Sequence, residues 1–294
     1  MSNKINADID DAIVSLRSVL KNFSLRRKLY QTLVRGRGLE FESFREYSPQ
    51  DDASLIDWKA SSKSNKLFVK QYREERNQKI IFAVDVGGNM VSGSEEKLKC
   101  EYAAEVLGAL SHLILGGGER VGFLFFSDKV NQFVLPRAGM KQFSMFIDEL
   151  TNANSYGGSS NISNVLDFIS KHVKETISSV ILVSDFISFD DESRKNLSLL
   201  SSRYETIALM IKDKLDLTLP DISREVIIED PKTGQQMIVN PSVAKKLYER
   251  NAIEQERKFA DVCRNQNVDL LKLMTDKPFA SELAMFLKGR TSRK

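Results

Sequence analysis

The feature that most constrains the fold is a repeated alternation of short apolar runs with amphipathic segments from residue 79 onward. The run KIIFAVDV, at residues 79–86, has the length and branched apolar content of a buried parallel strand, and SVILVSDF, at residues 179–186, repeats it. Between them lies LKCEYAAEVLGALSHLIL, at residues 98–115, with a helical period. We therefore predict an α/β fold of Rossmann type: a mostly parallel open sheet with helices on both faces.

Residues 1–78 do not follow this alternation, and we expect them to pack on a main domain formed by residues 79–294. Within them, a stripe of apolar residues predicts a helix over residues 8–33 that packs on its own domain or docks on a partner helix. Residues 34–78 are rich in charged and aromatic residues and are expected to form a charged collar. In the main domain, REVIIED and QQMIVN flank the turn PKTG and predict a small β-hairpin insertion at about residues 225–240.

Composition argues against several classes of protein. The formal net charge of +3 gives no general attraction to nucleic acid or to anionic membranes. The two cysteines, Cys100 and Cys263, are too few for a disulfide framework and are expected to be buried thiols in a reducing compartment. No stretch approaches the roughly 18 apolar residues that span a bilayer, and the first residues lack the features of a signal peptide. We expect a cytoplasmic protein.

Two of the predicted strands end in an aspartate, and a glycine-serine loop lies between them in the sequence. The aspartates are Asp85 and Asp185, and the loop NSYGGSSNIS, at residues 154–163, opens a helix. Carboxyl ends of parallel strands meet at one edge of a sheet, where ligands bind. Carboxylate, hydroxyl and amide oxygens suit Mg²⁺, Mn²⁺ or Ca²⁺. The alternative is that the aspartates cap the helices or turns that follow them.

This arrangement resembles the metal-ion-dependent adhesion site of von Willebrand factor A domains, whose pattern is Asp-x-Ser-x-Ser, a loop threonine and a strand-end aspartate. The stretch GRGLEFESFREYSPQDDASLIDWKASSKSNKLFVKQYREER, at residues 36–76, is similar to the signature of the bacterial "domain of unknown function fifty-eight" family, whose members carry an A-type domain. The likeness extends over roughly residues 30–280. It implies a von Willebrand factor A-like fold.

The metal site that the resemblance implies is only partly present. Asp85 matches the first ligand, but Gly87 stands at the first serine position and has no side-chain ligand. Asn89, at the second serine position, offers a carbonyl oxygen. Because a site with few protein ligands loses one oxygen, we predict that cation binding is weak or absent.

The second half of the implied site lies in the glycine-serine loop and the later strand. Ser159 or Ser160 replaces the loop threonine, and spacing alone does not decide between them. Asp185 matches the last ligand. A bound Mg²⁺, or Mn²⁺ or Ca²⁺ in its place, is expected to be held by Asp85, Asn89, Ser160 and Asp185.

The signature segment also carries candidate partner-binding residues. Arg35 and Arg37 flank glycines in a predicted loop, and Phe44, Arg45 and Trp58 follow them. Arginine and aromatic side chains are favoured anchors of protein interfaces, so we interpret this set as a docking surface. The alternative is a structural collar in which the aromatic residues pack on the sheet edge and the charges pair around them.

We predict a non-catalytic protein-binding adaptor. The only histidines, His112 and His172, lie in predicted helices, and the sequence has no phosphate-binding P-loop. Proteins resembling this family are often encoded beside MoxR-type AAA+ ATPases, so the resemblance implies such a partner in protein assembly or maturation. The alternatives are a metal-dependent phosphoester hydrolase that uses the two aspartates, and a nucleic-acid-binding protein that uses the Arg-Gly-Arg-Gly loop.

Overall fold

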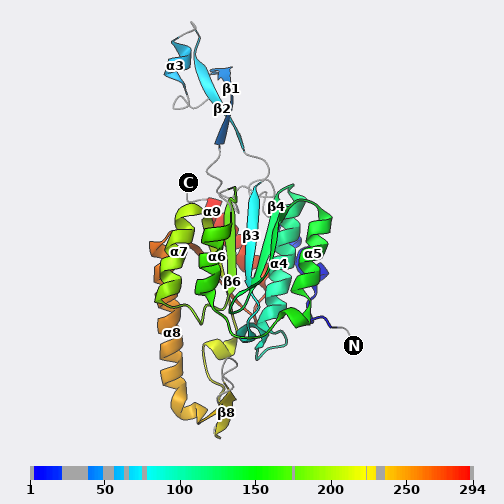
Figure 1. Ribbon diagram of the computed structural model, residues 1–294, viewed down its shortest axis with the longest axis vertical. Coiled ribbons are helices and arrows are strands. Elements are labelled where there is room, and N and C mark those ends of the chain that lie inside the picture. Colours follow the sequence, from blue (N-terminus) through cyan, green and yellow to red (C-terminus); the bar gives the residue numbers. More distant parts are fainter. Residues whose placement is uncertain are drawn as a thin grey trace.

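The computed structural model describes residues 3–21, 39–48, 56–62, 66–74, 78–173, 176–222, 224–229 and 236–291. Its centre is a six-stranded sheet in the order β10-β7-β6-β3-β4-β5 (Figure 1). All neighbouring strands are parallel except β5, which pairs antiparallel with β4 at one edge. The strands are β3 (Lys79–Asp85), β4 (Arg120–Phe126), β5 (Val130–Arg137), β6 (Ser179–Ser184), β7 (Glu205–Lys212) and β10 (Asp269–Met274). The predicted mostly parallel sheet is confirmed.

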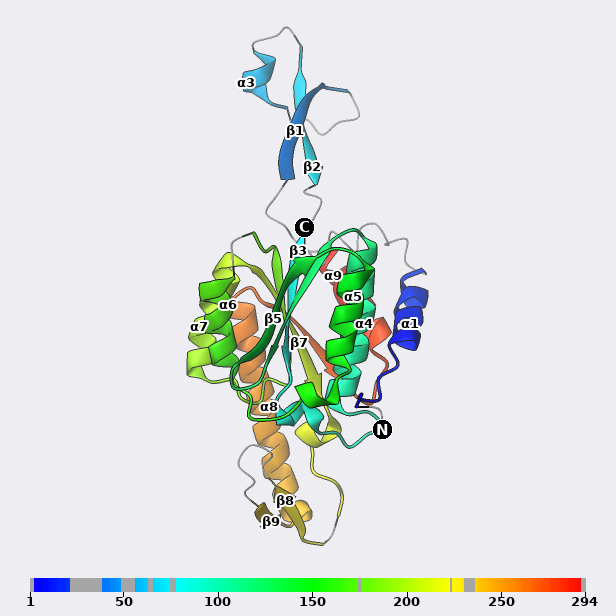
Figure 2. The same cartoon turned by 45° about the vertical axis from the view of Figure 1, so that its right-hand side comes forward.

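Helices cover both faces of this sheet (Figure 2). One face carries α1 (Ile9–Lys21), α4 (Lys99–Gly116), α5 (Met140–Leu150) and α9 (Phe279–Thr291). The other face carries α6 (Ile162–His172), α7 (Asp191–Arg203) and α8 (Pro241–Asn265). Successive side chains of a strand point to opposite faces, so Phe82 and Val84 of β3 enter the first core while Ile81 and Ala83 enter the second. Burial on both faces explains why the strands read as unbroken apolar runs.

Two carboxylates of α4 bind the backbone of the N-terminal segment, residues 3–8, through hydrogen bonds. Glu101 accepts a hydrogen bond from the backbone N–H of Asn6 at 2.9 Å, and Glu105 accepts one from that of Asp8 at 3.0 Å. The apolar stripe of α1 then packs in the core beside α4 and α9. Among the described residues that precede β3, residues 3–8 and α1 therefore lie on the main domain.

The charged and aromatic segment forms a separate hairpin. Strands β1 (Leu39–Glu46) and β2 (Phe68–Glu74) pair antiparallel, and the short helix α3 (Trp58–Ser61) lies beside them. Both views show this unit projecting beyond the end of the sheet at which β3 begins (Figures 1 and 2). Phe44 packs edge-on against Phe68, with ring centroids 6.3 Å apart, so this aromatic residue packs within the hairpin rather than on the sheet edge expected of a collar.

A second hairpin, β8 (Val226–Glu229) with β9 (Gln236–Val239), occupies the position predicted for the insertion. It leads directly into α8, and in both views the hairpin and the first turns of α8 project together beyond the opposite end of the sheet (Figures 1 and 2). Within the described residues, no helix combines the length and the apolar content that crossing a membrane requires.

Candidate functional site

The glycine-serine loop folds over the carboxyl end of β3. The backbone N–H of Gly157 donates to the carbonyl of Val86, and the N–H of Gly88 donates to the carbonyl of Gly158, both at 2.7 Å. Gly157 and Gly158 have φ angles of 138° and 78°, which favour glycine. The sequence therefore places two glycines where the chain must turn back toward Asp85, the last residue of β3.

Asp85 is buried, and its carboxylate accepts three hydrogen bonds within the protein. One carboxylate oxygen accepts from the N–H of Gly87 at 2.9 Å. The other accepts from the hydroxyls of Ser160 at 2.8 Å and Ser184 at 2.7 Å. The structure thus selects Ser160 over Ser159 as the loop residue that contacts Asp85. It also adds Ser184, which sequence reasoning missed although Ser184 directly precedes the strand-end Asp185.

The environment of Asp85 disfavours its charge. The pKa of Asp85 is raised to about 6. Burial is the largest cause and the nearby Asp185 adds to it, while the hydrogen bonds from Ser184, Gly87 and Ser160 partly oppose the rise. A carboxylate in this state is stabilised by hydroxyl and amide donors rather than by a neighbouring cation.

Gly87 and Asn89 stand at the two positions where the adhesion-site pattern has serines. A Cβ atom on Gly87 would lie 2.9 Å from Cβ of Ser160 and 3.0 Å from a carboxylate oxygen of Asp85, so the packed loop leaves no room for a serine there. Asn89 lies in the short helix η2 (Gly88–Val91), and its backbone carbonyl accepts a hydrogen bond from the Ser92 hydroxyl at 2.7 Å. The absence of a serine ligand is therefore built into the packing.

Asp185 is paired with an internal cation. Nζ of Lys99, the first residue of α4, lies 2.9 Å from Asp185 and 3.1 Å from both carboxylate oxygens of Asp216, in the short helix η4 (Lys214–Asp216). Lys99 is only 1% exposed. Burial opposes the charge of Lys99, but attraction to Asp185 and Asp216 outweighs it and raises the pKa of the lysine. Lys99 is thus a protonated ammonium bound between two carboxylates.

These contacts do not fit a divalent cation of the kind that adhesion sites hold. Asp85 accepts three hydrogen bonds from hydroxyl and amide donors, and Asp185 is bound to an ammonium group. In the part of the chain that the structure describes, no group of three or more His, Cys, Asp or Glu side chains is arranged to hold a metal. Cation binding by Asp85, Asn89, Ser160 and Asp185 stays a prediction, and the position of Lys99 argues against it.

Three of the expected partner-binding residues are described by the structure, and they lie far from this edge of the sheet (Figure 1). Phe44 and Arg45 belong to β1 and Trp58 begins α3, so they share the projecting hairpin, and Phe44 and Trp58 are exposed. Arg35 and Arg37 lie outside the described residues. The sequence-based candidates therefore divide into two regions: the carboxyl edge of the sheet and the β1–β2 hairpin.

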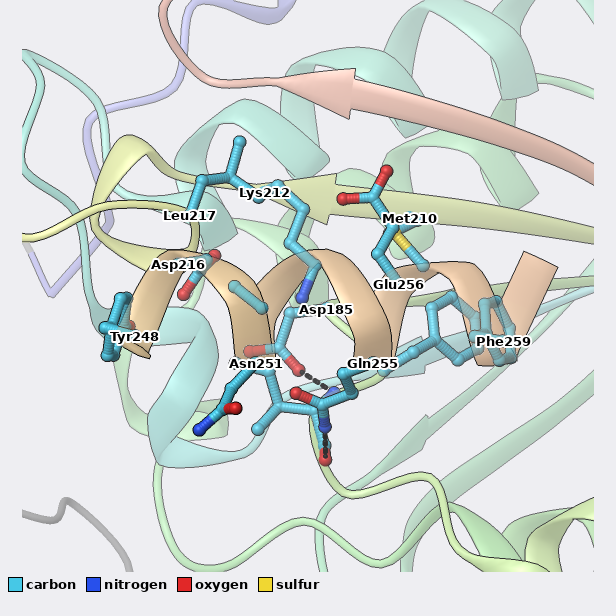
Figure 3. Close-up of a pocket in the computed structure, with 13 residues that line it drawn as sticks. Asp185, Met210, Lys212, Asp216, Leu217, Tyr248, Asn251, Gln255, Glu256 and Phe259 are labelled. Carbon is cyan, nitrogen blue, oxygen red and sulfur yellow. Dashed lines mark hydrogen bonds between the residues drawn. The ribbon is translucent and has the colours of Figure 1, made fainter. Parts of the chain in front are cut away.

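A pocket beside Asp185 had no counterpart in the sequence analysis. It has a volume of about 300 Å³ and lies between the ends of β6 and β7 and the helix α8 (Figure 3). Lys212, the last residue of β7, lines it. The sequence offers only a weak indication that Lys212 belongs to a site: it ends an apolar run, as the strand-end aspartates nearly do, and so lies at the same sheet edge.

An open α/β sheet with an antiparallel edge strand and the strand-end residues Asp85 and Asp185 at its carboxyl edge defines a von Willebrand factor A-like protein. The chain belongs to the family described as "Protein of unknown function DUF58", which matches residues 43–258. This confirms the family predicted from the sequence.

Relatives of this chain include uncharacterized proteins of mycobacteria. Rv1480 of Mycobacterium tuberculosis is 24% identical over 297 residues, which cover 97% of this chain and 92% of that protein. Mb1516 of Mycobacterium bovis matches with the same identity and the same coverage, 97% and 92%.

Similar solved structures include von Willebrand factor A domains. The conserved hypothetical protein BatB from Bacteroides thetaiotaomicron has a TM-score of 0.47 and 9% identity, covering 73% of this chain and 99% of that chain. The SpRpn10 VWA domain has a TM-score of 0.41 and 10% identity, covering 71% and 94%. A von Willebrand factor type A protein from Catenulispora acidiphila has a TM-score of 0.38 and 11% identity, covering 74% and 43%.

Proposed function

We propose that this protein is a non-catalytic cytoplasmic adaptor that binds a protein client through an exposed apolar surface, without a divalent cation, and works with a MoxR-type AAA+ ATPase. The observation that carries the proposal is the apolar end, which we define as the exposed apolar side chains of the β8–β9 hairpin and the first turns of α8. These side chains are Ile227, Met237, Ile238, Val243 and Leu247, and each is more than half exposed.

The apolar end has the character of an interaction site. Its residues lie on consecutive segments that project beyond the sheet (Figure 2). Exposed apolar side chains that cluster on one segment mark binding surfaces, whereas single ones are ordinary. Val243 and Leu247 are four residues apart on α8, so they lie on one face of the helix. A client with an apolar helix or strand is the chemistry that such a surface fits.

The potential catalytic side chains support a non-catalytic role. His112 contacts Arg17, and His172 stacks on Phe168 with ring centroids 4.6 Å apart. Burial raises the pKa of the Cys100 and Cys263 thiols to about 12, so both stay protonated and unreactive at neutral pH. Buried free thiols also fit a reducing compartment such as the cytoplasm.

The position of Lys99 supports the proposal that client binding needs no divalent cation. In the expected adhesion site, a cation at the sheet edge would complete its coordination with an acidic group of the partner. Here the ammonium of Lys99 already neutralises Asp185 and Asp216. Client binding is therefore assigned to apolar contact rather than to a metal bridge.

The ATPase partner comes from the family resemblance, and the β1–β2 hairpin is the surface we assign to it. Phe44 and Trp58 are exposed there, and Arg45 lies beside Phe44. The hairpin and the apolar end project from opposite ends of the sheet (Figure 1), so one protein could hold an ATPase and a client together.

The test is affinity capture from native lysate, with partners identified by mass spectrometry. The double variant Val243→Asp/Leu247→Asp should lose the client and keep the ATPase, while Phe44→Ala/Trp58→Ala should do the reverse. Leu199→Asp, on the exposed side of α7, is the matched control and should lose neither. A client retained by the α8 double variant would refute the apolar end as its site. A client released by chelator alone would show that a divalent cation is required.

A further inference from the structure

The pocket beside Asp185 combines apolar walls with a group of charged residues (Figure 3). The apolar walls include Met210 and Phe259. The charged residues are Lys212 from β7, Asp185 from the end of β6, Asp216 from η4 and Glu256 from α8. A volume of about 300 Å³ is enough for a small organic group.

Lys212 is the residue of this pocket whose charge has no direct partner. It is only 7% exposed, and its side chain reaches from β7 toward the middle of the pocket (Figure 3). Among the residues that the structure describes, its Nζ forms no hydrogen bond and no ion pair. Burial of the Lys212 side chain is costly, because it removes much of the hydration of the ammonium and no group among the described residues binds the ammonium directly in return.

The three carboxylates around Lys212 are bound to two other lysines, Lys99 and Lys272. Asp185 and Asp216 hold Lys99, and Glu256 accepts from Lys272 at 2.7 Å. The pKa values of the two buried lysines therefore shift in opposite directions. Burial lowers the pKa of Lys212, and the more distant Asp185 and Asp216 only partly oppose this effect. For Lys99 the same two carboxylates, in direct contact, reverse the effect of burial.

Within the described part of the chain, the ammonium of Lys212 lacks an anionic oxygen bound directly to it. A carboxylate supplies one negative charge and oxygen acceptors at hydrogen-bonding distance. Asp185, Asp216 and Glu256 repel any anion, and a phosphate with up to two negative charges would meet about twice the repulsion that a carboxylate meets. The walls formed by Met210 and Phe259 favour an apolar body next to the acid group.

We propose that this pocket binds a carboxylate group, with the ammonium of Lys212 as its ionic anchor. The carboxylate can belong to a free organic acid or to an aspartate or glutamate side chain of a protein. This inference does not depend on the apolar end, which lies on other residues.

The test is calorimetric titration of the full chain with two sets of probes. The free acids are acetate, glutarate and benzoate, each matched by its neutral amide. The protein source is represented by the peptide acetyl-Gly-Gly-Glu-Gly-Gly-amide, matched by the same peptide with glutamine. Wild type and Lys214→Met should bind an acid but not its amide, and Lys212→Met should bind at least tenfold more weakly. Lys214 is the matched control because it is an exposed lysine two residues away that pairs with Glu95.

The outcomes separate the two sources. Binding of a free acid supports a small-molecule site, and binding of the glutamate peptide alone supports capture of an acidic side chain. The proposal is overturned if neither binds at about 10 mM, if Lys212→Met binds as well as wild type, or if inorganic phosphate binds as tightly as the acids. A second measurement uses wild type alone: a bound acid should slow acetylation of Lys212 by an amine-reactive reagent and leave that of Lys214 unchanged.

Discussion

Nζ of Lys99 lies 2.9 Å from the carboxylate of Asp185, although the two residues are 86 positions apart in the sequence. This contact places the ammonium of Lys99 at the sheet edge where a von Willebrand factor A-type site would hold a divalent cation. The positive charge at this edge is therefore covalently attached to α4. Once the protein has folded, a residue of the chain itself therefore balances the charge of Asp185.

Replacing Lys99 with methionine should strongly destabilise the protein. The change keeps the length of the side chain but leaves Asp185 and Asp216 without their shared partner in a buried place. Breaking a buried ion pair by removing one partner costs about 3–5 kcal/mol. Urea unfolding followed by circular dichroism measures the loss. Lys214→Met, at an exposed lysine, should change the midpoint little, and equal stability of Lys99→Met and wild type would contradict the role assigned to the ammonium.

Replacing Lys212 with methionine should have the opposite effect. Lys212 is buried without a direct partner, so its removal relieves a desolvation cost instead of creating one. We expect a gain of about 1–3 kcal/mol in the free energy of unfolding, from the cost of burying an unsatisfied polar group. The same urea titration checks it, and a loss comparable to that of Lys99→Met would show that Lys212 is an essential counter-ion of Asp185 and Asp216.

The sequence predicts the parts of this site that depend on local pattern, but not those that depend on contacts between residues far apart in the sequence. The strands were predictable because burial on both faces makes them continuous apolar runs. Asp85 and the glycine-serine loop were predictable because strand ends and their loops meet at one sheet edge, but the choice of Ser160 over Ser159 needed the structure. Lys99 was not, since a lysine that begins an amphipathic helix usually faces solvent. Only the packing of α4 against the sheet turns Lys99 toward Asp185. The projecting β1–β2 hairpin was missed for the same reason. Its aromatic residues indicate that side chains pack together, but the sequence does not say which element they pack against.

The stability of the protein should carry a pH signature from Asp85. Its pKa is raised from 3.8 to about 6 in the folded state, so the folded protein holds a proton that the unfolded chain releases between these values. This contribution to stability is fully present below about pH 4 and is lost as the pH rises through about 6. At about 1.4 kcal/mol per pKa unit, the total is roughly 3 kcal/mol.

The measurement is the difference in free energy of unfolding between wild type and Asp85→Asn at several pH values. Asparagine has no charge to bury, so the advantage of wild type over the variant should shrink from pH 4 to pH 6.5. Asp190→Asn provides a control of opposite sign. Hydrogen bonds from the side chain and backbone of Ser193 lower the pKa of Asp190, so its contribution is lost as the pH falls. A pH-independent difference for Asp85→Asn would mean that its carboxyl titrates normally.

Restoring the adhesion-site serine should harm the protein rather than create a metal site. In Gly87→Ser the new Cβ would lie 2.9 Å from Cβ of Ser160 and 3.0 Å from a carboxylate oxygen of Asp85, so the loop must shift. Overpacking of this kind costs about 1–3 kcal/mol. Thermal unfolding should therefore show a lower Tm for Gly87→Ser, whether or not Mg²⁺ is present.

Two further variants decide whether close packing is the cause. Gly116→Ser adds the same side chain where no atom lies within 4 Å of the new Cβ, so it should cost much less. Gly87→Ser combined with Ser160→Gly removes the clashing Cβ and should recover part of the loss, although it also removes the hydroxyl that donates to Asp85. A Mg²⁺-dependent rise in the Tm of Gly87→Ser would show instead that the loop opens to admit a cation, and that Lys99 leaves enough of Asp185 free to bind it.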